Sequence, residues 1–560
     1  MLHYLVILSY SGSHSYLDNE TIIGYANNIG IQGAPSEDIF LLSIPFFNTI
    51  QVKDRVKPKL SISDKVIANN GIDIGFHLYF DHDQSNIELA TMNITSADTE
   101  ILKNLIITHK NYQITIDQNT KFVPIGTTNQ SELKLYTTFY FTIYTNGMQI
   151  VDFTLNLSNL TEVKPSDQIK FVYSTKYIQG RPPTPNTNND YFVDHLLRKY
   201  ASICSIVQAL LFISLVITIY NQMKSEFEHP STHNEDFDLL MTSDKGWMLL
   251  HGDMFYAPQY HFLLANFVSH GMSCLITLIS VTFYAYAFNK DHNSTRYIQA
   301  FIIAYVFSSI ISGWFSSSLS ILFSDKKWLR IVLSSVILPF TCYLMILLSI
   351  NFFTNYSSPY SISLSTVTML ISFICFPCLF ISTISGAISY KYNLQRNSFD
   401  TALVPHTIPP QPWYLSGFSG CIFITIFVCS SILPELFYLN NFIWLKKPCD
   451  SFAGLFISTL TSNIVAACAS ICFIYFRIHN ENYHWQWISF AAPAAAMIPI
   501  FIYSLYFYLF KFEIRSYISA TVFLTRSLLI SLMFGLSYGG IGFISTKNFI
   551  NFIFSNAKLD

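Results

Sequence analysis

The distribution of apolar residues divides the chain into two parts. Over residues 16–200, apolar residues occur in short runs or alternate with polar and charged ones, whereas beyond residue 200 they form long runs with few charges. A period of two is typical of β-strands with one face in water, and runs of roughly 20 apolar residues can cross a bilayer as helices. The pattern therefore predicts a β-rich domain followed by a membrane domain.

The first part is predicted to be an all-β, sandwich-like domain. Residues 134–160 are rich in Thr, Tyr, Phe and Ile, which favour strands, and Asn146-Gly147 interrupts them as a hairpin signal. Residues 168–178 alternate again, and the Pro- and Asn-rich stretch 181–190 is expected to be a linker. All ten cysteines lie beyond residue 200, so an apolar core must hold this domain without disulfides.

Nine apolar stretches in the second part are long enough to span a membrane as helices. They cover residues 201–221, 260–288, 297–323, 329–353, 362–390, 417–438, 453–477, 487–511 and 517–545. Residues 222–259 then form a loop, the eight further spans lie within 260–545, and residues 546–560 form a tail. The short apolar run 2–10, followed by small residues, predicts a secretory signal peptide within residues 1–15, with a first β-strand as the alternative.

If the β domain is translocated, the loop 222–259 and the C-terminal tail lie in the cytosol. Basic residues near span ends then divide ten to eight in favour of the cytosolic side, a small excess. Seven N-x-S/T sequons support this orientation better, because none lies in a predicted cytosolic loop. These candidate glycosylation sites are Asn19, Asn93, Asn129, Asn156, Asn159, Asn293 and Asn355.

Composition agrees with a membrane protein and argues against a nucleic-acid partner. Of the 560 residues, 51% are hydrophobic and only 12% are charged, against roughly 25% in soluble chains. The 32 basic and 34 acidic residues give a net charge of −2, so no basic excess is present to hold a phosphate backbone.

A few ionisable residues stand out against this apolar background. His270, Glu435 and Arg526 lie at membrane depth, where such residues are costly unless paired or wetted, so each is a candidate functional residue. A pair between Arg526 and Glu435 is conceivable. At the predicted cytosolic face, His251 with Asp253, and His484 near Glu481, could bind a metal ion or shuttle protons, although helix-entry turns and interfacial anchors explain them more simply.

The chain contains no nucleotide-binding, zinc-protease or serine-hydrolase motif, so we expect no catalytic residue, no metal site, no cofactor and no enzyme. Cys375 and Cys378 form a C-x-x-C, but they lie inside an apolar span beside Pro377, and we interpret them as apolar core residues. Gly535-x-x-x-Gly539, with Gly542 beyond, predicts a face where another helix approaches closely. That helix belongs either to the bundle, which we favour, or to another protein.

Several short motifs stand in a fixed order against the nine predicted spans. They contain Gly246, Trp247, His251, Gly252 and Asp253; Lys327 and Trp328; Pro409, Gln411 and Tyr414; Glu435; Tyr483, His484, Trp485 and Trp487; Gly539 and Gly542; and the final Lys558-Leu559-Asp560. Through these motifs the chain resembles the nonaspanin (transmembrane nine) superfamily from Gly246 to the end, over about 315 residues.

The chain also departs from the family pattern. Tyr256-Ala257-Pro258 stands where the family usually has Arg-Pro-Pro, and Ile488 stands where it usually has Arg. The first 200 residues match only loosely. The resemblance therefore describes a divergent member.

The resemblance implies a Golgi or endosomal multi-span protein that helps sort and deliver other membrane proteins, with a lumenal N-terminal domain and a cytosolic C-terminus. Its expected partners are membrane lipids, client transmembrane proteins that include some with Gly-rich segments, and the COPI coat. Lys558, Leu559 and Asp560 are similar to the family's K-x-D retrieval signal for that coat.

Two other functions remain as alternatives. A transporter or channel, for example for a metal ion, would use residues from the set His251, Asp253, Glu435, His484 and Arg526. A membrane-embedded hydrolase would need a nucleophile and a base close together, which no motif supplies.

Overall fold

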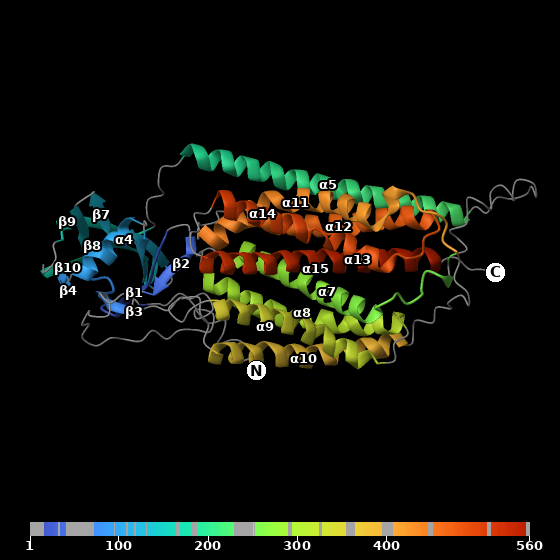
Figure 1. Cartoon of the computed structure of the whole chain (residues 1–560), viewed down its shortest axis with the longest axis horizontal. Helices are drawn as coiled ribbons and strands as arrows, with labels where there is room; N and C mark the ends of the chain where they lie inside the picture. The colour runs from blue at the N-terminus through green and yellow to red at the C-terminus, as the bar shows by residue number, and fades with distance from the viewer. Residues whose placement is uncertain are drawn as a thin grey trace, which may run out of the picture.

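The computed structural model describes residues 16–31, 34–40, 72–94, 96–107, 110–116, 119–129, 132–163, 168–180, 188–228, 250, 252–288, 294–323, 327–353, 364–394, 407–445, 452–511 and 517–555. A β domain and a bundle of long helices follow one another along the long axis of the molecule (Figure 1). The predicted signal peptide and the final residues 556–560 lie outside the described residues.

One five-stranded sheet of the β domain is built on its longest strand, β1. The sheet contains β1 (Thr21–Ile31), β2 (Ala34–Phe40), β3 (Ile72–Tyr79), β5 (Lys110–Ile116) and β6 (Asn119–Pro124). β3 and β2 pair with the first and second parts of β1, β5 pairs with its other edge, and β6 pairs with β5. All of these pairs are antiparallel.

The second five-stranded sheet contains β4 (Gln84–Asn93), β7 (Gly126–Asn129), β8 (Glu132–Asn146), β9 (Gln149–Glu162) and β10 (Gln168–Gln179). β10 runs parallel to β8, whereas the other pairs are antiparallel. The predicted hairpin is confirmed, because Asn146 pairs with Gln149 across the turn. Gly147 has a φ of +61° there, which glycine adopts without a steric penalty.

Aromatic side chains join the two sheets into the predicted sandwich. Phe76 of β3 makes edge-to-face contacts with Phe141 of β8 and Tyr173 of β10, at centroid distances of 5.0 and 5.5 Å. All three side chains are buried. The structure adds one helix to the predicted all-β domain, α4 (Ser96–Ile107), which buries Leu102 in the same core.

The described residues of the second part contain nine apolar helical segments long enough to cross a membrane, as predicted. The long helices are α5 (Asn188–Glu228), α7 (His261–Phe288), α8 (Ser294–Leu322), α9 (Trp328–Phe353), α10 (Leu364–Leu394), α11 (Gly417–Leu445), α12 (Ala453–His479), α13 (Gln486–Ala494), α14 (Met497–Phe510) and α15 (Tyr517–Ser555). α13 and α14 together make one span.

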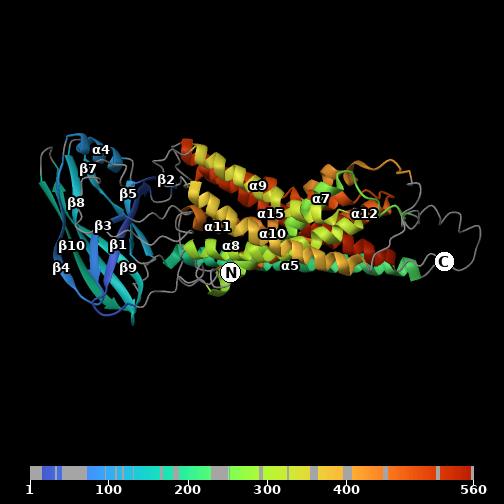
Figure 2. The same cartoon turned by 90° about the horizontal axis from the view of Figure 1, so that it is seen from below.

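The helices differ strongly in how far they are enclosed. In the most apolar stretch of α12, 72% of residues are buried inside the protein, with 67% for α7 and 61% for α15, but only 22% for α5. Figure 1 shows α5 along one side of the bundle and α10 on the opposite side, and in Figure 2 α5 again follows one edge. α7, α12 and α15 thus form the centre, and α5 is a peripheral helix.

The eighth span is broken, although its apolar run predicts a single helix over 487–511. α13 ends at Ala494 and α14 begins at Met497. Pro499 has no N–H to donate to the carbonyl of Ala495, which instead accepts a bond from the amide of Ile498. This tighter turn, one turn beyond Pro493, separates the two helices.

Two helices extend ten or more residues past the predicted span ends. α5 begins at Asn188, inside the predicted linker, and no glycine or proline interrupts it. α15 continues to Ser555, ten residues into the predicted tail 546–560. Phe549, Ile550 and Phe554 of this extension are buried in the bundle core, which explains why the helix continues.

Candidate functional site

Family-like motifs that are distant in sequence meet at the end of the bundle away from the β domain. The indole Nε1 of Trp485 donates a hydrogen bond of 2.9 Å to the carbonyl of Met254, and Trp487 Nε1 donates one of 2.8 Å to the carbonyl of Gln259. Gln486 Nε2 also donates to Met254, over 3.3 Å. The segment 483–487 is therefore fixed to the turn that precedes α7.

A second connection joins the segment 407–415 to the end of α12. Gln411 Nε2 donates to the carbonyl of Asn480 over 2.8 Å. Arg477 Nη1 donates to the carbonyl of Leu415 over 2.9 Å. Leu415 belongs to the short helix η3 (Trp413–Leu415) that leads into α11, so these bonds set where α11 enters the bundle. Tyr414, predicted as a motif residue, is exposed there.

The glycine motif of α15 packs inside the protein. A methyl group at Gly539 would lie 2.7 Å from the ring of Phe490, and one at Gly542 would lie 2.7 Å from Pro493 Cγ. Gly535 lies against Met497 in the same way. The interpretation that this face serves the bundle is confirmed, because α13 and the start of α14 occupy it.

Trp485 links these motifs. Its side chain is 1% exposed and stacks on Phe543 at a centroid distance of 5.3 Å. The side-chain N–H groups of Trp485, Gln486 and Gln411 donate to main-chain carbonyls, so they satisfy buried backbone groups. This arrangement determines how the helices join.

The ionisable residues of the same end have separate surroundings. Asp253 lies in the turn before α7 and is 3% exposed, while His484 stacks on Tyr483 at 4.5 Å. Partial burial lowers the pKa of His484 from its usual 6.5, and the nearby charge of Arg477 lowers it further. Among the described residues, no three His, Cys, Asp or Glu side chains are grouped closely enough to hold a metal ion. His251, Gly246 and Trp247 lie outside the described residues.

A buried ion pair lies at the opposite end, near the β domain. Arg198 of α5 binds Glu435 of α11 through Nη2, over 2.8 Å, and through Nε, over 3.0 and 3.1 Å. Glu435 is fully buried, and the guanidinium also lies 4.5 Å from the ring centre of Tyr438. Gly454 of α12 provides the space, because a side chain there would collide with the Glu435 carboxylate.

This pair corrects the sequence-based suggestion that Arg526 is the partner of Glu435. Arg198 lies only two residues inside the first span, which begins at Leu196. The sequence pattern places the start of this span at residue 201, because charged residues such as Lys199 precede the apolar run, so the pattern does not indicate Arg198 as a partner. The helical character of residues 188–200 is the signal that could have revealed it, since it places Arg198 on a helix packed against α11 and α12.

A second polar contact fixes the peripheral helix. Gln208 of α5, two to three turns beyond Arg198, donates to the carbonyl of Phe427 over 3.0 Å. Its Oε1 accepts hydrogen bonds from Ser430 and Ser431 at 3.1 and 3.0 Å. Sequence reasoning missed Gln208, because a single polar residue in an apolar run does not indicate its partner.

His270, the third ionisable residue at membrane depth, has polar neighbours. Its Nε2 lies 3.1 Å from the hydroxyl of Tyr343 and 3.5 Å from the sulfur of Cys274. The adjoining cavity, lined also by Ser273 and Ser312, has a volume of about 10 Å³, room for roughly one water molecule. Cys378 lines it too and is buried, as expected for a core cysteine, whereas Cys375 is only half-buried.

The four described residues named for a transporter are not brought together, and the fifth, His251, lies outside the described residues. Glu435 lies near the β domain and is neutralised by Arg198, whereas Asp253 and His484 lie at the far end of the bundle. Arg526 lies in the first third of α15.

The sequons are only partly described. Asn19, Asn156 and Asn159 are exposed on the β domain. The side chains of Asn93 and Asn129, and the whole of Asn293 and Asn355, lie outside the described residues, as do Lys558, Leu559 and Asp560.

Comparison with known families decides what kind of protein carries this architecture. The family model of endomembrane protein 70 matches residues 43–517, which include the second sheet, the motif segments as far as Trp487 and all spans but the last. The chain belongs to the endomembrane protein 70 family. The resemblance to the transmembrane nine superfamily is thereby confirmed.

Curated relatives carry the corresponding names. This endomembrane protein 70 chain is 24% identical over 418 residues to transmembrane 9 superfamily member 10 of Arabidopsis thaliana, covering 72% of the chain and 64% of the relative. It is 23% identical over 587 residues to member 4 of the same plant, covering 99% and 96%. A Dictyostelium discoideum relative, named as a phagocytic receptor, is 23% identical over 584 residues, covering 99% and 97%.

With several of its relatives, the chain matches less than two thirds of the relative's length. The share is 64% for Arabidopsis member 10 and 60% for transmembrane 9 superfamily member 1 of Saccharomyces cerevisiae. No solved structure matches the chain. The relatives are named as membrane proteins and receptors, and these names describe no enzyme.

Proposed function

We propose that this endomembrane protein 70 chain is a Golgi or endosomal protein that helps sort other membrane proteins and deliver them to the cell surface. The observation that carries the proposal is the use of the motif residues: they fasten helices to one another and line no reaction site or ion path among the described residues. A rigid bundle that carries a separate β domain suits the recognition of other proteins better than chemistry or transport.

In this proposal the β domain is lumenal and meets the exposed parts of clients, while the bundle meets their transmembrane segments. The glycine face of α15 is already occupied by α13 and α14, so clients must use other surfaces. The outer face of α5 is suited to this role, since Leu210 and Leu211 are 60% and 64% exposed on the least enclosed helix.

Retrieval to the Golgi would use Lys558-Leu559-Asp560 as a K-x-D signal read by the COPI coat. The signal would begin three residues after the end of α15 at Ser555, a position from which a short charged segment can reach a cytosolic receptor.

Changing Lys558 to Ser is expected to move the protein from the Golgi to later compartments, because the receptor loses its cationic contact. Fluorescence microscopy with compartment markers measures the shift. Leu559→Ala, at the variable position of the signal, is the matched control and should stay in the Golgi. Unchanged localisation of the Lys558→Ser variant would show that this tail is not the retrieval signal.

Crosslinking and mass spectrometry in native membranes test the sorting role itself. Recovery of membrane proteins with Gly-rich spans supports the proposal. A protein that recovers no client and moves ions in proteoliposomes contradicts it.

A further inference from the structure

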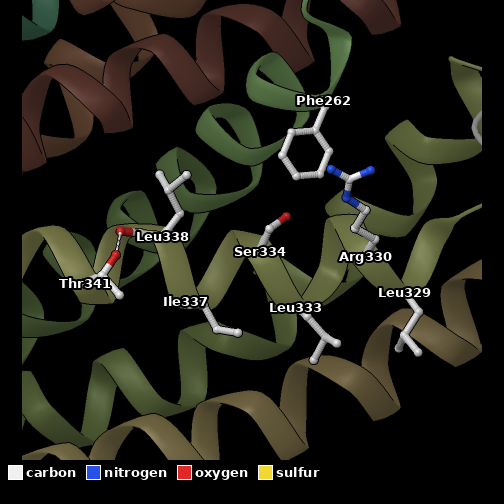
Figure 3. A pocket seen from close by; sticks show the side chains of 8 residues that line it. All are labelled: Phe262, Leu329, Arg330, Leu333, Ser334, Ile337, Leu338 and Thr341. Carbon is white, nitrogen blue, oxygen red and sulfur yellow. Dashed lines mark hydrogen bonds between the residues drawn. The ribbon is translucent and has the colours of Figure 1, made fainter.

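A groove follows α9 at the end of the bundle away from the β domain (Figure 3). It is open to the outside along its length and has a volume of about 690 Å³. Leu333, Ile337, Leu338 and Thr341 line its length, and Arg330 lies with Phe262 of α7 at its end. The groove is therefore apolar along its length and carries a single positive charge at one end.

The charge at this end is open to a ligand. The guanidinium carbon of Arg330 lies 4.9 Å from the ring centre of Phe262, which orients the group, and the side chain remains exposed. No ion pair of Arg330 occurs with any described residue. A guanidinium offers five N–H donors in a planar fork that matches the oxygens of a phosphate.

The groove has the depth of one membrane leaflet. α9 begins at Trp328, whose ring stacks on Tyr390 at 5.2 Å, and tryptophan favours the headgroup region. Arg330 lies at nearly the same depth. At 1.5 Å per residue, Thr341 lies ~16 Å further along the helix, close to half of a hydrocarbon core of about 30 Å.

The lining argues for a lipid rather than a helix as the occupant. Helices that pack against one another in membranes present small residues, as Gly271 of α7 and Gly540 of α15 do where these two helices cross. The groove instead presents mainly Leu and Ile side chains and no glycine, and Ser334 is its one small residue. A flexible acyl chain fits such a surface, and an anionic headgroup complements Arg330.

We propose that this groove binds one anionic phospholipid. Its headgroup, which carries a net negative charge, contacts the guanidinium of Arg330, and one acyl chain lies along Leu333, Ile337 and Thr341. If the β domain is lumenal, as proposed above, the lipid belongs to the cytosolic leaflet, where anionic lipids are concentrated. Lipid binding in the groove does not depend on that orientation. The lipid-binding proposal can therefore be wrong while the sorting role is right, and the reverse.

The test measures lipids retained by the purified full chain. The protein, in detergent, is mixed with equal amounts of phosphatidylserine and phosphatidylcholine and examined by native mass spectrometry. We expect a preference of roughly fivefold for one phosphatidylserine, the factor that corresponds to about 1 kcal/mol for one cation near an anionic surface. Arg330→Gln should abolish the preference while leaving retention of phosphatidylcholine.

Two further variants separate the charge from the groove. Ile337→Trp keeps Arg330 but fills the groove, so retention of both lipids should fall. Lys391→Gln removes an exposed cation in the last turn of α10, at the same end but outside the groove, and should behave like the unmodified protein. Melting temperatures of all variants establish that each is folded.

Three results would overturn the proposal. Equal loss of preference in Arg330→Gln and Lys391→Gln would mean that a diffuse positive surface attracts the lipid. An unchanged preference in Arg330→Gln would exclude this headgroup contact. A photocrosslinker at position 337 that captures a polypeptide in native membranes, and no lipid, would show that a client helix occupies the groove.

Discussion

At the scale of single residues, charges inside the bundle determine which helices belong together. Glu435 is fully buried and is balanced by Arg198, 237 residues earlier in the chain. Taking both ions out of water is costly, so the pair does not by itself add much stability. A lone Glu435 would remain buried without a counter-charge, so losing one partner is much worse than losing both.

Arg198→Met is therefore expected to destabilise the bundle by about 3–5 kcal/mol. The double variant Arg198→Met with Glu435→Met should recover most of that loss, because no unpaired charge remains. Thermal unfolding in detergent, followed by tryptophan fluorescence, measures both. Equal losses in the single and double variants would contradict this account.

His484 gives the far end of the bundle a dependence on pH. Its pKa is lower in the folded protein than its usual 6.5, so the unfolded chain binds the additional proton first as the pH falls. Stability attributable to this residue is present above pH 6.5 and is lost as the pH falls from there toward the folded pKa. His484→Gln should lose less stability than the unmodified protein between pH 7 and pH 5. Parallel curves of melting temperature against pH would argue against this contribution.

At the scale of elements, close helix crossings depend on single glycines. Gly271 of α7 faces the carbonyl of Leu536, and a methyl group there would also lie 3.1 Å from the Cα of Gly540. These neighbours are backbone atoms of α15, which cannot move aside as a side chain can. The crossing of two central helices is therefore fixed at this point.

Gly271→Ala should force α7 and α15 apart and lower stability by about 1–3 kcal/mol, the usual effect of overpacking. Gly417→Ala is the matched control, since its nearest neighbour, Ile488, would be 3.9 Å away. Melting temperatures of the two variants decide the matter. If both variants melt at the same temperature, α7 and α15 accommodate an additional methyl group at this crossing, and the account is wrong.

At the scale of the whole molecule, an odd number of described spans would place the β domain and the end of α15 on opposite sides of the membrane. Nine described spans separate the β domain from the end of α15. The β domain is larger than the described loop segments at the other end of the bundle. It carries exposed sequons. The proposed lumenal position can therefore be tested on this domain.

Asn156→Gln is expected to remove one glycan from the β domain, because Asn156 is exposed on β9 in an N-x-S sequon. A mobility shift that glycosidase treatment abolishes in the unmodified protein would measure it. Asn104→Gln, an exposed asparagine of α4 outside any sequon, is the control. A β domain that stays unglycosylated and is cut by protease added from the cytosolic side would reverse the orientation.

The sequence alone determined the two-part architecture, the nine spans, the hairpin at Asn146-Gly147 and the family. These features depend on residues that are near one another in the chain, since hydropathy over about 20 residues decides whether a segment can span a membrane. Only the tertiary structure decided that Glu435 pairs with Arg198, that α13 and α14 occupy the glycine face of α15, and that a charged groove lies along α9. Each of these depends on how helices distant in sequence pack, and lipid-exposed and helix-facing positions have similar apolar composition, so the pattern of a single helix does not show its partner.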